Sequence, residues 1–196
     1  MDYETIQTIF VFLFITIFFI KLIISKINNI KIIQIYSQRG SLKQFLYEIM
    51  PLILVTIIIL VTLSNYFERG PVIPDIYNFN FHYYINNIGL LIGSISFVFL
   101  ILGYQQLGLN WKIGSGRNFN SLVTSGIFSI TRNPVYVFFI MFSFSIFLLN
   151  GSIIFLLLSI LLALSFHRVI LQEEKNLEKL FKENYINYKK RTPRYL

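Results

Sequence analysis

The sequence predicts an all-α integral membrane protein with five transmembrane helices and a cytoplasmic C-terminal amphipathic helix. Hydrophobic residues make up 55% of the 196 residues and charged residues only 13%, a balance that no soluble domain of this length needs. Several apolar runs are long enough to cross a hydrocarbon core, which takes about 20 helical residues. Lysine and arginine are concentrated in alternate connections between these runs, as in multi-pass membrane proteins.

Five apolar segments define the predicted transmembrane helices. The first is expected to be a retained helix rather than a cleaved signal, because Asp2 and Glu4 precede it and no small-residue cleavage site follows. Only Asn150 and Gly151 separate the last two, which predicts a tight antiparallel hairpin. The five segments are residues 6–24, 45–66, 84–104, 134–149 and 152–170.

The distribution of basic residues predicts the orientation. Of the 17 lysines and arginines, all but Arg69 lie in or beside the first and third connections or in the tail. By the positive-inside rule, the N-terminus is then outside and the tail is cytoplasmic. The net charge of +8 is expected to face anionic membrane lipids, and no nucleic acid is expected as a partner. Without repeats or linkers, residues 1–196 are predicted to form one membrane domain, with N-terminal helices in 6–104 and a C-terminal core in 105–196.

The tail is predicted to be helical from Gln172 onward. Its apolar residues recur every three or four positions, which places them on one face of a helix. Such a helix lies along the membrane surface or folds over the bundle, and Glu178 and Lys182 are expected to pair on its polar side. The apolar positions are Leu177, Leu180, Phe181, Tyr185 and Tyr188.

The fourth predicted helix begins with the polar group Arg132-Asn133-Pro134. Proline is favoured at the first helical position and asparagine is a good N-cap, so Asn133 and Pro134 are enough to start a helix. A helix start also presents free N–H groups, and the Arg132 guanidinium adds a fork that suits a carboxylate or a phosphate. The sequence leaves open whether Arg132 binds an anionic group there or only snorkels to lipid headgroups.

Glu173 and Glu174 form a second polar cluster, just after the fifth predicted helix. Adjacent carboxylates at the start of the tail helix are ordinary helix-dipole chemistry. Glu173 shares the face of Leu177, so it is expected to point inward, whereas Glu174 is expected to remain an exposed helix-start charge. An inward carboxylate near the membrane interface needs a cation, either Arg168 or a bound ligand. Because a hairpin brings these helix ends together, the cluster is expected to face Arg132 and to form with it a site for a molecule that carries both charges.

Other kinds of active site are not indicated. The chain has no cysteine, and His82 and His167 are predicted to lie on opposite sides of the membrane, so no metal site is expected. The Gly-Ser-Gly at 114–116 lacks the strand and spacing of a nucleotide-binding loop, and no Ser-His-Asp arrangement is evident.

Two stretches of the C-terminal half resemble a known family. They are NSLVTSGIFSITRNPVY at 120–136 and EEKNLEKLFKENYINYKKRTPR at 173–194, with the predicted hairpin between them. In this order they resemble the motifs of isoprenylcysteine carboxyl methyltransferases, which belong with the phospholipid N-methyltransferases. The resemblance covers about residues 107–194. Five helices resemble the short prokaryotic members, so a prokaryotic cell membrane is the expected location.

The resemblance implies an S-adenosylmethionine-dependent methyltransferase with its core in residues 105–196. The cofactor is then expected at the cytoplasmic ends of the last two helices, under the tail, and the acceptor is expected to be a lipophilic or lipidated molecule. Arg168 is the candidate for orienting the substrate, one residue before Val169, where the family has its substrate-contacting arginine. The candidate cofactor contacts are Asn120, Leu122, Val123, Phe128, Asn133, Pro134, Tyr136 and Glu173.

The chain departs from the family pattern at some of these positions. Asn120 and Asn133 stand where the family often has histidine, Phe128 stands where it has tyrosine, and Lys182 stands where glycine is common. An amide does not change charge near neutral pH, so no titrating base is expected.

The resemblance implies prenylcysteine carboxyl methylation as the expected reaction, with a phospholipid amine or a lipophilic thiol as alternative acceptors. Transfer to a carboxylate would not require a base. An NADPH-dependent membrane sterol-type reductase is a rival function, and a non-enzymatic membrane protein is a third. Lys112, Arg117 and Arg132 are few basic residues for the extra phosphates of NADPH.

Overall fold

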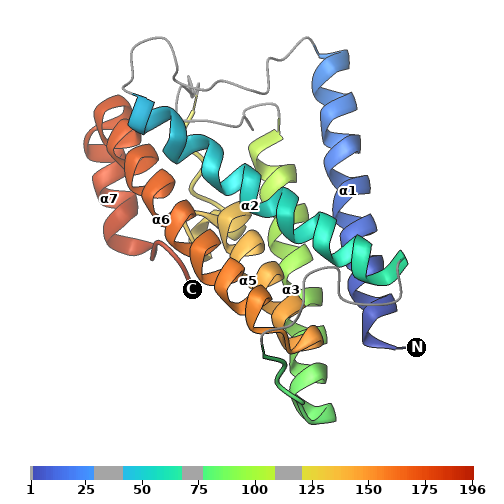
Figure 1. Cartoon of the computed structure of the whole chain (residues 1–196). Coiled ribbons are helices and arrows are strands. Elements are labelled where there is room, and N and C mark those ends of the chain that lie inside the picture. Colours follow the sequence, from blue (N-terminus) through green and yellow to red (C-terminus); the bar gives the residue numbers. More distant parts are fainter. Residues whose placement is uncertain (1, 29–41, 68–76, 109–120) are drawn as a thin grey trace.

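The computed structural model describes residues 2–28, 42–67, 77–108 and 121–196. These ranges form helices and connecting segments (Figure 1). One isolated β-bridge within them joins Asn78 and Ser152. All five predicted transmembrane segments are helical, and their ends lie within a few residues of the prediction except at the C-terminal end of the last. The helices are α1 (Tyr3–Ile27), α2 (Leu42–Phe67), α3 (Tyr83–Leu107), α4 (Ile127–Ile130), α5 (Pro134–Asn150), α6 (Ile153–Phe181) and α7 (Glu183–Arg191).

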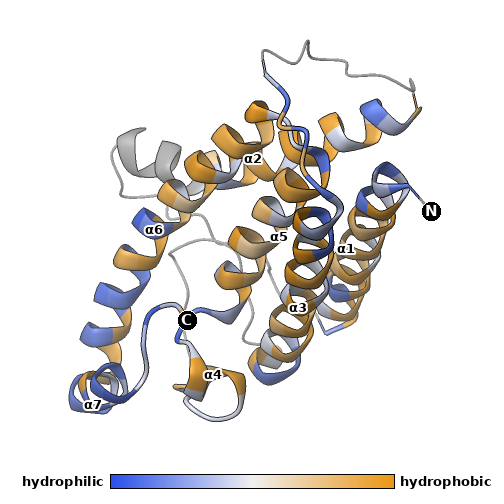
Figure 2. Ribbon diagram, turned by 90° about the horizontal axis from the view of Figure 1, so that it is seen from below, coloured by the Kyte–Doolittle hydropathy of each residue, from blue (hydrophilic) through white to orange (hydrophobic). Residues whose placement is uncertain are grey.

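Four of the described helices are long and apolar enough to cross a membrane: α1, α3, α6 and the part of α2 at Ile49–Phe67. α5 is also apolar but has only 17 residues, at the lower limit for a spanning helix. Apolar residues dominate these helices (Figure 2), and many of them are exposed, among them Phe19 and Leu60. Exposed apolar surface of this extent marks a protein that contacts lipid.

The short helix α5 packs against α1, α3 and α6. Its Phe138 ring lies 5.5 Å from the ring of Phe14 in α1 and 5.4 Å from that of Phe97 in α3, so aromatic contacts form the core. α3 approaches α5 closely at Gly93, where a Cβ atom would lie 2.5 Å from Ser145 Oγ. Small residues permit this close approach of two membrane helices. α5 is therefore fixed in place by its neighbours along its length.

Amide side chains satisfy the backbone at the C-terminal end of α5. The helix ends at Gly151, whose φ of 81° lies in the left-handed region that glycine favours. Asn86 Nδ2 of α3 donates to the Leu149 carbonyl at 3.1 Å, and Gln7 Nε2 of α1 donates to the Ile146 carbonyl at 3.3 Å. In apolar surroundings such carbonyls need donors from the protein itself. Two residues then lead into α6, which packs against α5.

The tail differs from the prediction of one helix starting near residue 172. α6 continues to Phe181, because residues 171–181 are mostly good helix formers and contain no glycine or proline. The helix breaks at Lys182, whose φ of 47° is left-handed, and α7 follows. The break leaves Leu180 54% exposed, contrary to the prediction that it faces inward. Glu178 pairs with Lys189 of α7 rather than with Lys182 as predicted.

The turn at Lys182 brings α7 and the residues after it back to the bundle. Tyr185 and Tyr188 of α7 are buried, as their spacing predicted. After α7, the Pro193 carbonyl accepts a hydrogen bond from the Arg132 N–H at 3.0 Å. Of the two predicted arrangements of the tail, the structure therefore has the one in which it folds against the bundle.

Candidate functional site

Residues at the start of α5 bind the segment that follows α7. Pro134 is the first residue of α5, as predicted, but the Asn133 side chain makes no capping hydrogen bond. Its Nδ2 instead donates to the Arg194 carbonyl at 3.1 Å. The fully buried Thr131 donates from Oγ1 to the same carbonyl at 3.0 Å. Two elements about 60 residues apart in the sequence therefore meet here.

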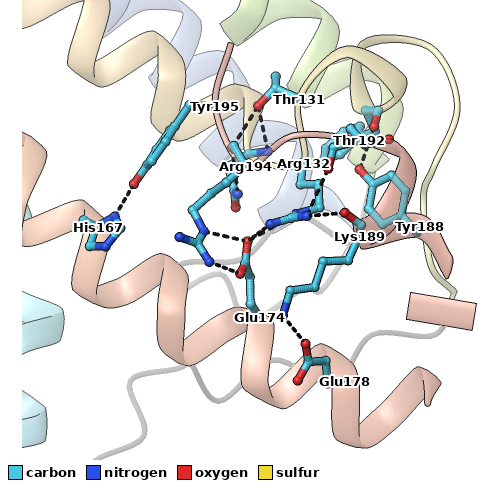
Figure 3. Close-up of polar contacts among 12 residues, drawn as sticks. Thr131, Arg132, His167, Glu174, Glu178, Tyr188, Lys189, Thr192, Arg194 and Tyr195 are labelled. Carbon is cyan, nitrogen blue, oxygen red and sulfur yellow. Dashed lines mark hydrogen bonds and ion pairs between the residues drawn. The ribbon is translucent and has the colours of Figure 1, made fainter. Parts of the chain in front are cut away.

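Glu174 of α6 binds two arginines (Figure 3). Its Oε1 accepts from Nη2 and Nε of Arg132, at 2.8 and 3.2 Å, and from Nε of Arg194 at 3.1 Å. Its Oε2 accepts from Nη2 of Arg194 at 2.8 Å. The side chains of Glu174 and Arg132 are only 5% and 6% exposed. The prediction that Glu174 is an exposed helix-start charge is wrong, because α6 continues through it and the returning tail covers it.

Arg132 directs its other terminal nitrogen to the tail. Nη1 donates to the carbonyls of Lys189 and Thr192, both at 3.0 Å. The guanidinium fork predicted to suit an anionic group thus binds a carboxylate of the same chain and two backbone carbonyls. Its burial excludes the alternative of an arginine that snorkels to lipid headgroups.

Glu173 is buried, as predicted, and contacts α5. Its Oε1 accepts a hydrogen bond of 2.6 Å from the Tyr136 hydroxyl, and the Tyr136 ring lies 5.1 Å from that of Phe166, also on α6. Consecutive residues of a helix point about 100° apart, which follows from 3.6 residues per turn. The two adjacent carboxylates therefore contact different groups. Glu173 binds Tyr136 of α5, whereas Glu174 binds Arg132 and the tail residue Arg194.

A small cavity of about 50 Å³ lies beside these groups. Three of the predicted cofactor contacts, Leu122, Val123 and Phe128, line it, and so does Arg132. The other lining residues are Leu107, Ser121, Leu177, Tyr185 and Tyr188. The wall is thus mainly apolar and aromatic, with one guanidinium.

The remaining predicted contacts in the described ranges do not line this cavity. They are Asn133, Pro134, Tyr136 and Glu173. Glu173 precedes the lining residue Leu177 by four positions, so the two lie on the same side of α6, about one turn apart. Arg168, predicted to orient the substrate, is exposed on α6. Asn120 lies outside the described residues.

The sequence prediction missed Arg194 and the role of the tail tyrosines. The Tyr188 hydroxyl donates to the Phe128 carbonyl at 2.6 Å and so joins α7 to α4. Burial raises the pKa of both Tyr185 and Tyr188, which keeps them neutral hydrogen-bond donors. Hydrogen bonding to Glu174 raises the pKa of Arg194. The only signal in the sequence was the basic ending KKRTPR, which does not show which arginine returns to the bundle.

The chemistry of these residues fits parts of S-adenosylmethionine. The ammonium and sulfonium of that molecule suit a carboxylate such as Glu173, and its adenine suits the apolar wall of the cavity. The cavity volume, however, is below the roughly 300–1,000 Å³ of ordinary ligand pockets. The cavity that the described residues line therefore does not enclose a molecule of that size. Within the same ranges, no group of three His, Cys, Asp or Glu side chains is arranged to hold a metal ion.

The fold and the site define an all-helical membrane protein with a buried polar cluster beside a small apolar cavity. The sequence model of the phospholipid methyltransferase family matches residues 85–184, just over half of the chain, from α3 into α7. The chain therefore belongs to the phospholipid methyltransferase family, which includes the isoprenylcysteine carboxyl methyltransferases. The match begins in α3, further towards the N-terminus than the motifs described above. No curated protein matches the chain.

Proposed function

We propose that the protein transfers a methyl group from S-adenosylmethionine to a lipophilic acceptor at the cytoplasmic face of a membrane. The observation that carries this proposal is the buried carboxylate of Glu173, held by the Tyr136 hydroxyl on the same side of α6 as a residue that lines the apolar cavity. A buried carboxylate favours a positively charged group beside it, and the ammonium and sulfonium of the methyl donor are such groups. Membership of a methyltransferase family supports the same chemistry.

Six of the candidate residues have a role in this proposal. S-adenosylmethionine supplies an electrophilic methyl group on its sulfonium. Glu173 faces the positive charge of the methyl donor, Tyr136 orients that carboxylate, and Asn133 offers an amide at the start of α5. The apolar wall for the adenine consists of Leu122, Val123 and Phe128. These side chains hold the donor in place and exclude water, which are the main contributions a protein makes to such a displacement.

We propose a carboxylate as the methyl acceptor, as in prenylcysteine carboxyl methylation. A carboxylate is already an anionic nucleophile, which agrees with the asparagine at position 133, where a titrating base is absent. A phospholipid amine and a lipophilic thiol are the alternatives. A reductase that uses NADPH is disfavoured, because Arg132 and Arg194 both bind Glu174 and the Arg132 side chain is almost completely buried.

The decisive experiment measures binding of radiolabelled S-adenosylmethionine and of NADPH to the purified protein in detergent. Binding of S-adenosylmethionine alone supports the proposal, whereas binding of NADPH alone establishes the reductase alternative. Binding of neither leaves a non-enzymatic membrane protein. Methyl transfer to a prenylcysteine analogue, a phosphatidylethanolamine and a lipophilic thiol then identifies the acceptor.

We further propose that α5 is a fifth membrane span, with the N-terminus outside and the tail in the cytoplasm. The bias of lysine and arginine supports this orientation, and the two-residue connection to α6 supports a return across the membrane. Reporter fusions at Leu196 and at Asn150 are expected to report opposite sides. A cytoplasmic signal at Asn150 would overturn this topology.

A further inference from the structure

Arg194 contacts both helices of the proposed site although it belongs to neither. Its side chain makes two hydrogen bonds to Glu174 of α6, at 2.8 and 3.1 Å. Its backbone carbonyl accepts from Thr131 at 3.0 Å (Figure 3). The same carbonyl accepts from Asn133, just before α5, at 3.1 Å. A single residue after α7 thus connects the two helices that carry the polar groups of the site.

The covalent connection between α5 and α6 is at the other end of both helices, at Gly151 and Ser152. At the site end, the spacing of the two helices depends on side-chain contacts. The hydrogen bond between Tyr136 and Glu173 is one such contact, and the Arg194 bridge is another. Positioning of a reacting group is sensitive to displacements of about 1 Å, so a bridge at this point matters for binding geometry.

The bridge also determines the orientation of the Asn133 amide. An asparagine side chain has one donor group and one acceptor group. Because a carbonyl accepts only, the amide must present its nitrogen to the Arg194 carbonyl. The Asn133 oxygen takes no part in this contact and remains an acceptor.

We propose that Arg194 is a positioning residue for the methyl-donor site: by binding Glu174 it holds its own carbonyl against Asn133 and so fixes the Asn133 amide relative to Glu173. This inference rests on the proposed function, since it concerns the residues that would hold S-adenosylmethionine. It adds a residue that does not touch the ligand.

The structure makes Arg194 testable without loss of the fold. Its side chain is 28% exposed, whereas Arg132 and Glu174 are almost fully buried and bind each other directly. Removing the Arg194 guanidinium therefore leaves Glu174 with a buried counter-charge. Arg191 is a matched control, because it is exposed on α7 and, among the described residues, donates only to the Asn187 carbonyl of its own helix.

The test is calorimetric titration of S-adenosylmethionine into the full chain and into its variants. The single variants are Arg194→Met, Arg191→Met and Asn133→Ala, and the double variant combines Arg194→Met with Asn133→Ala. We expect Arg194→Met to weaken binding about three- to tenfold, as when one neutral hydrogen bond is no longer held in place. Arg191→Met is expected to bind as the unaltered chain does. The double variant is expected to bind no more weakly than Asn133→Ala, because Arg194 acts through Asn133. Thermal unfolding of each variant shows whether it is folded. If Arg194→Met does not fold, Arg194→Lys, which keeps the positive charge, takes its place in the titration.

The outcomes separate this inference from the proposed function. If the unaltered chain does not bind S-adenosylmethionine, the proposed function fails, and with it this inference. If the unaltered chain binds and Arg194→Met binds equally well, only this inference is overturned. Additive losses in the double variant overturn it as well, because they show that Arg194 supports the fold in general and does not act through Asn133.

Discussion

Replacing Glu174 with glutamine is expected to destabilise the fold more than any other exchange of a carboxylate for an amide on α6. Glu174 accepts four hydrogen bonds from Arg132 and Arg194, and it is almost completely buried. Glutamine keeps the shape and one acceptor oxygen but leaves the buried Arg132 without a counter-charge. Breaking a buried ion pair in this way costs about 3–5 kcal/mol. With some hydrogen bonding retained, we expect about 3 kcal/mol, which lowers the melting temperature of a chain of this size by about 6–12 °C.

The assay is thermal unfolding in detergent, followed by circular dichroism, with Glu178→Gln as the control. Glu178 lies one helical turn further along α6 and pairs with Lys189, but these side chains are 35% and 40% exposed. An ion pair with this exposure contributes about 0–1 kcal/mol, so a shift of at most about 4 °C is expected. Equal shifts for Glu174→Gln and Glu178→Gln would refute the reasoning from burial.

Three further predictions concern single positions. Lys182→Gly is expected to raise the melting temperature by a few degrees, because lysine holds a positive φ of 47° at a cost of about 1–2 kcal/mol. The greater conformational entropy of glycine in the unfolded state offsets part of this gain, and a lower melting temperature would contradict the prediction. Gly93→Val is expected to cost about 1–3 kcal/mol in the free energy of unfolding, because even its Cβ would lie 2.3 Å from the Phe10 ring of α1 and 2.5 Å from Ser145 Oγ of α5; an unchanged unfolding curve would show that α3 does not pack against α1 and α5 as described. Tyr136→Phe is expected to weaken S-adenosylmethionine binding about three- to tenfold in calorimetry, since Glu173 loses its hydroxyl partner; unchanged affinity would remove Tyr136 from the site.

The long helices were predictable because an apolar run of this length has few alternatives to a helix in a membrane. The predicted bounds of α1 and α3 are within three residues of those observed. The break after α6 was not predictable in the same way. Lys182 takes a positive φ of 47°, and lysine carries none of the turn signal that glycine gives at such a position. The prediction of one tail helix therefore placed Leu180 on an inward face, whereas in the structure the helix breaks two residues later and Leu180 is exposed.

The burial of the two adjacent glutamates was predicted correctly for Glu173, where local spacing decides it, and wrongly for Glu174, where the tail decides it. Glu173 is buried because it shares a face with Leu177, which is a property of one helix. The burial of Glu174 depends on Arg194, 20 positions later, returning to the bundle. No rule of helix periodicity contains that information. For the same reason, the sequence indicated that Arg132 suits a carboxylate but did not identify Glu174 as that carboxylate.

The contacts of Glu174 also affect its neighbour Glu173. The Arg132 and Arg194 side chains bind Glu174 from two different segments, so they fix the rotation of α6 about its axis at this level. Because adjacent residues of one helix keep a constant angle of about 100°, fixing the direction of Glu174 also fixes that of Glu173. The Tyr136 hydroxyl then holds Glu173 from α5. The adjacent glutamates are therefore not equivalent: one holds the helix in position through the tail, and its position directs the other towards the proposed methyl donor.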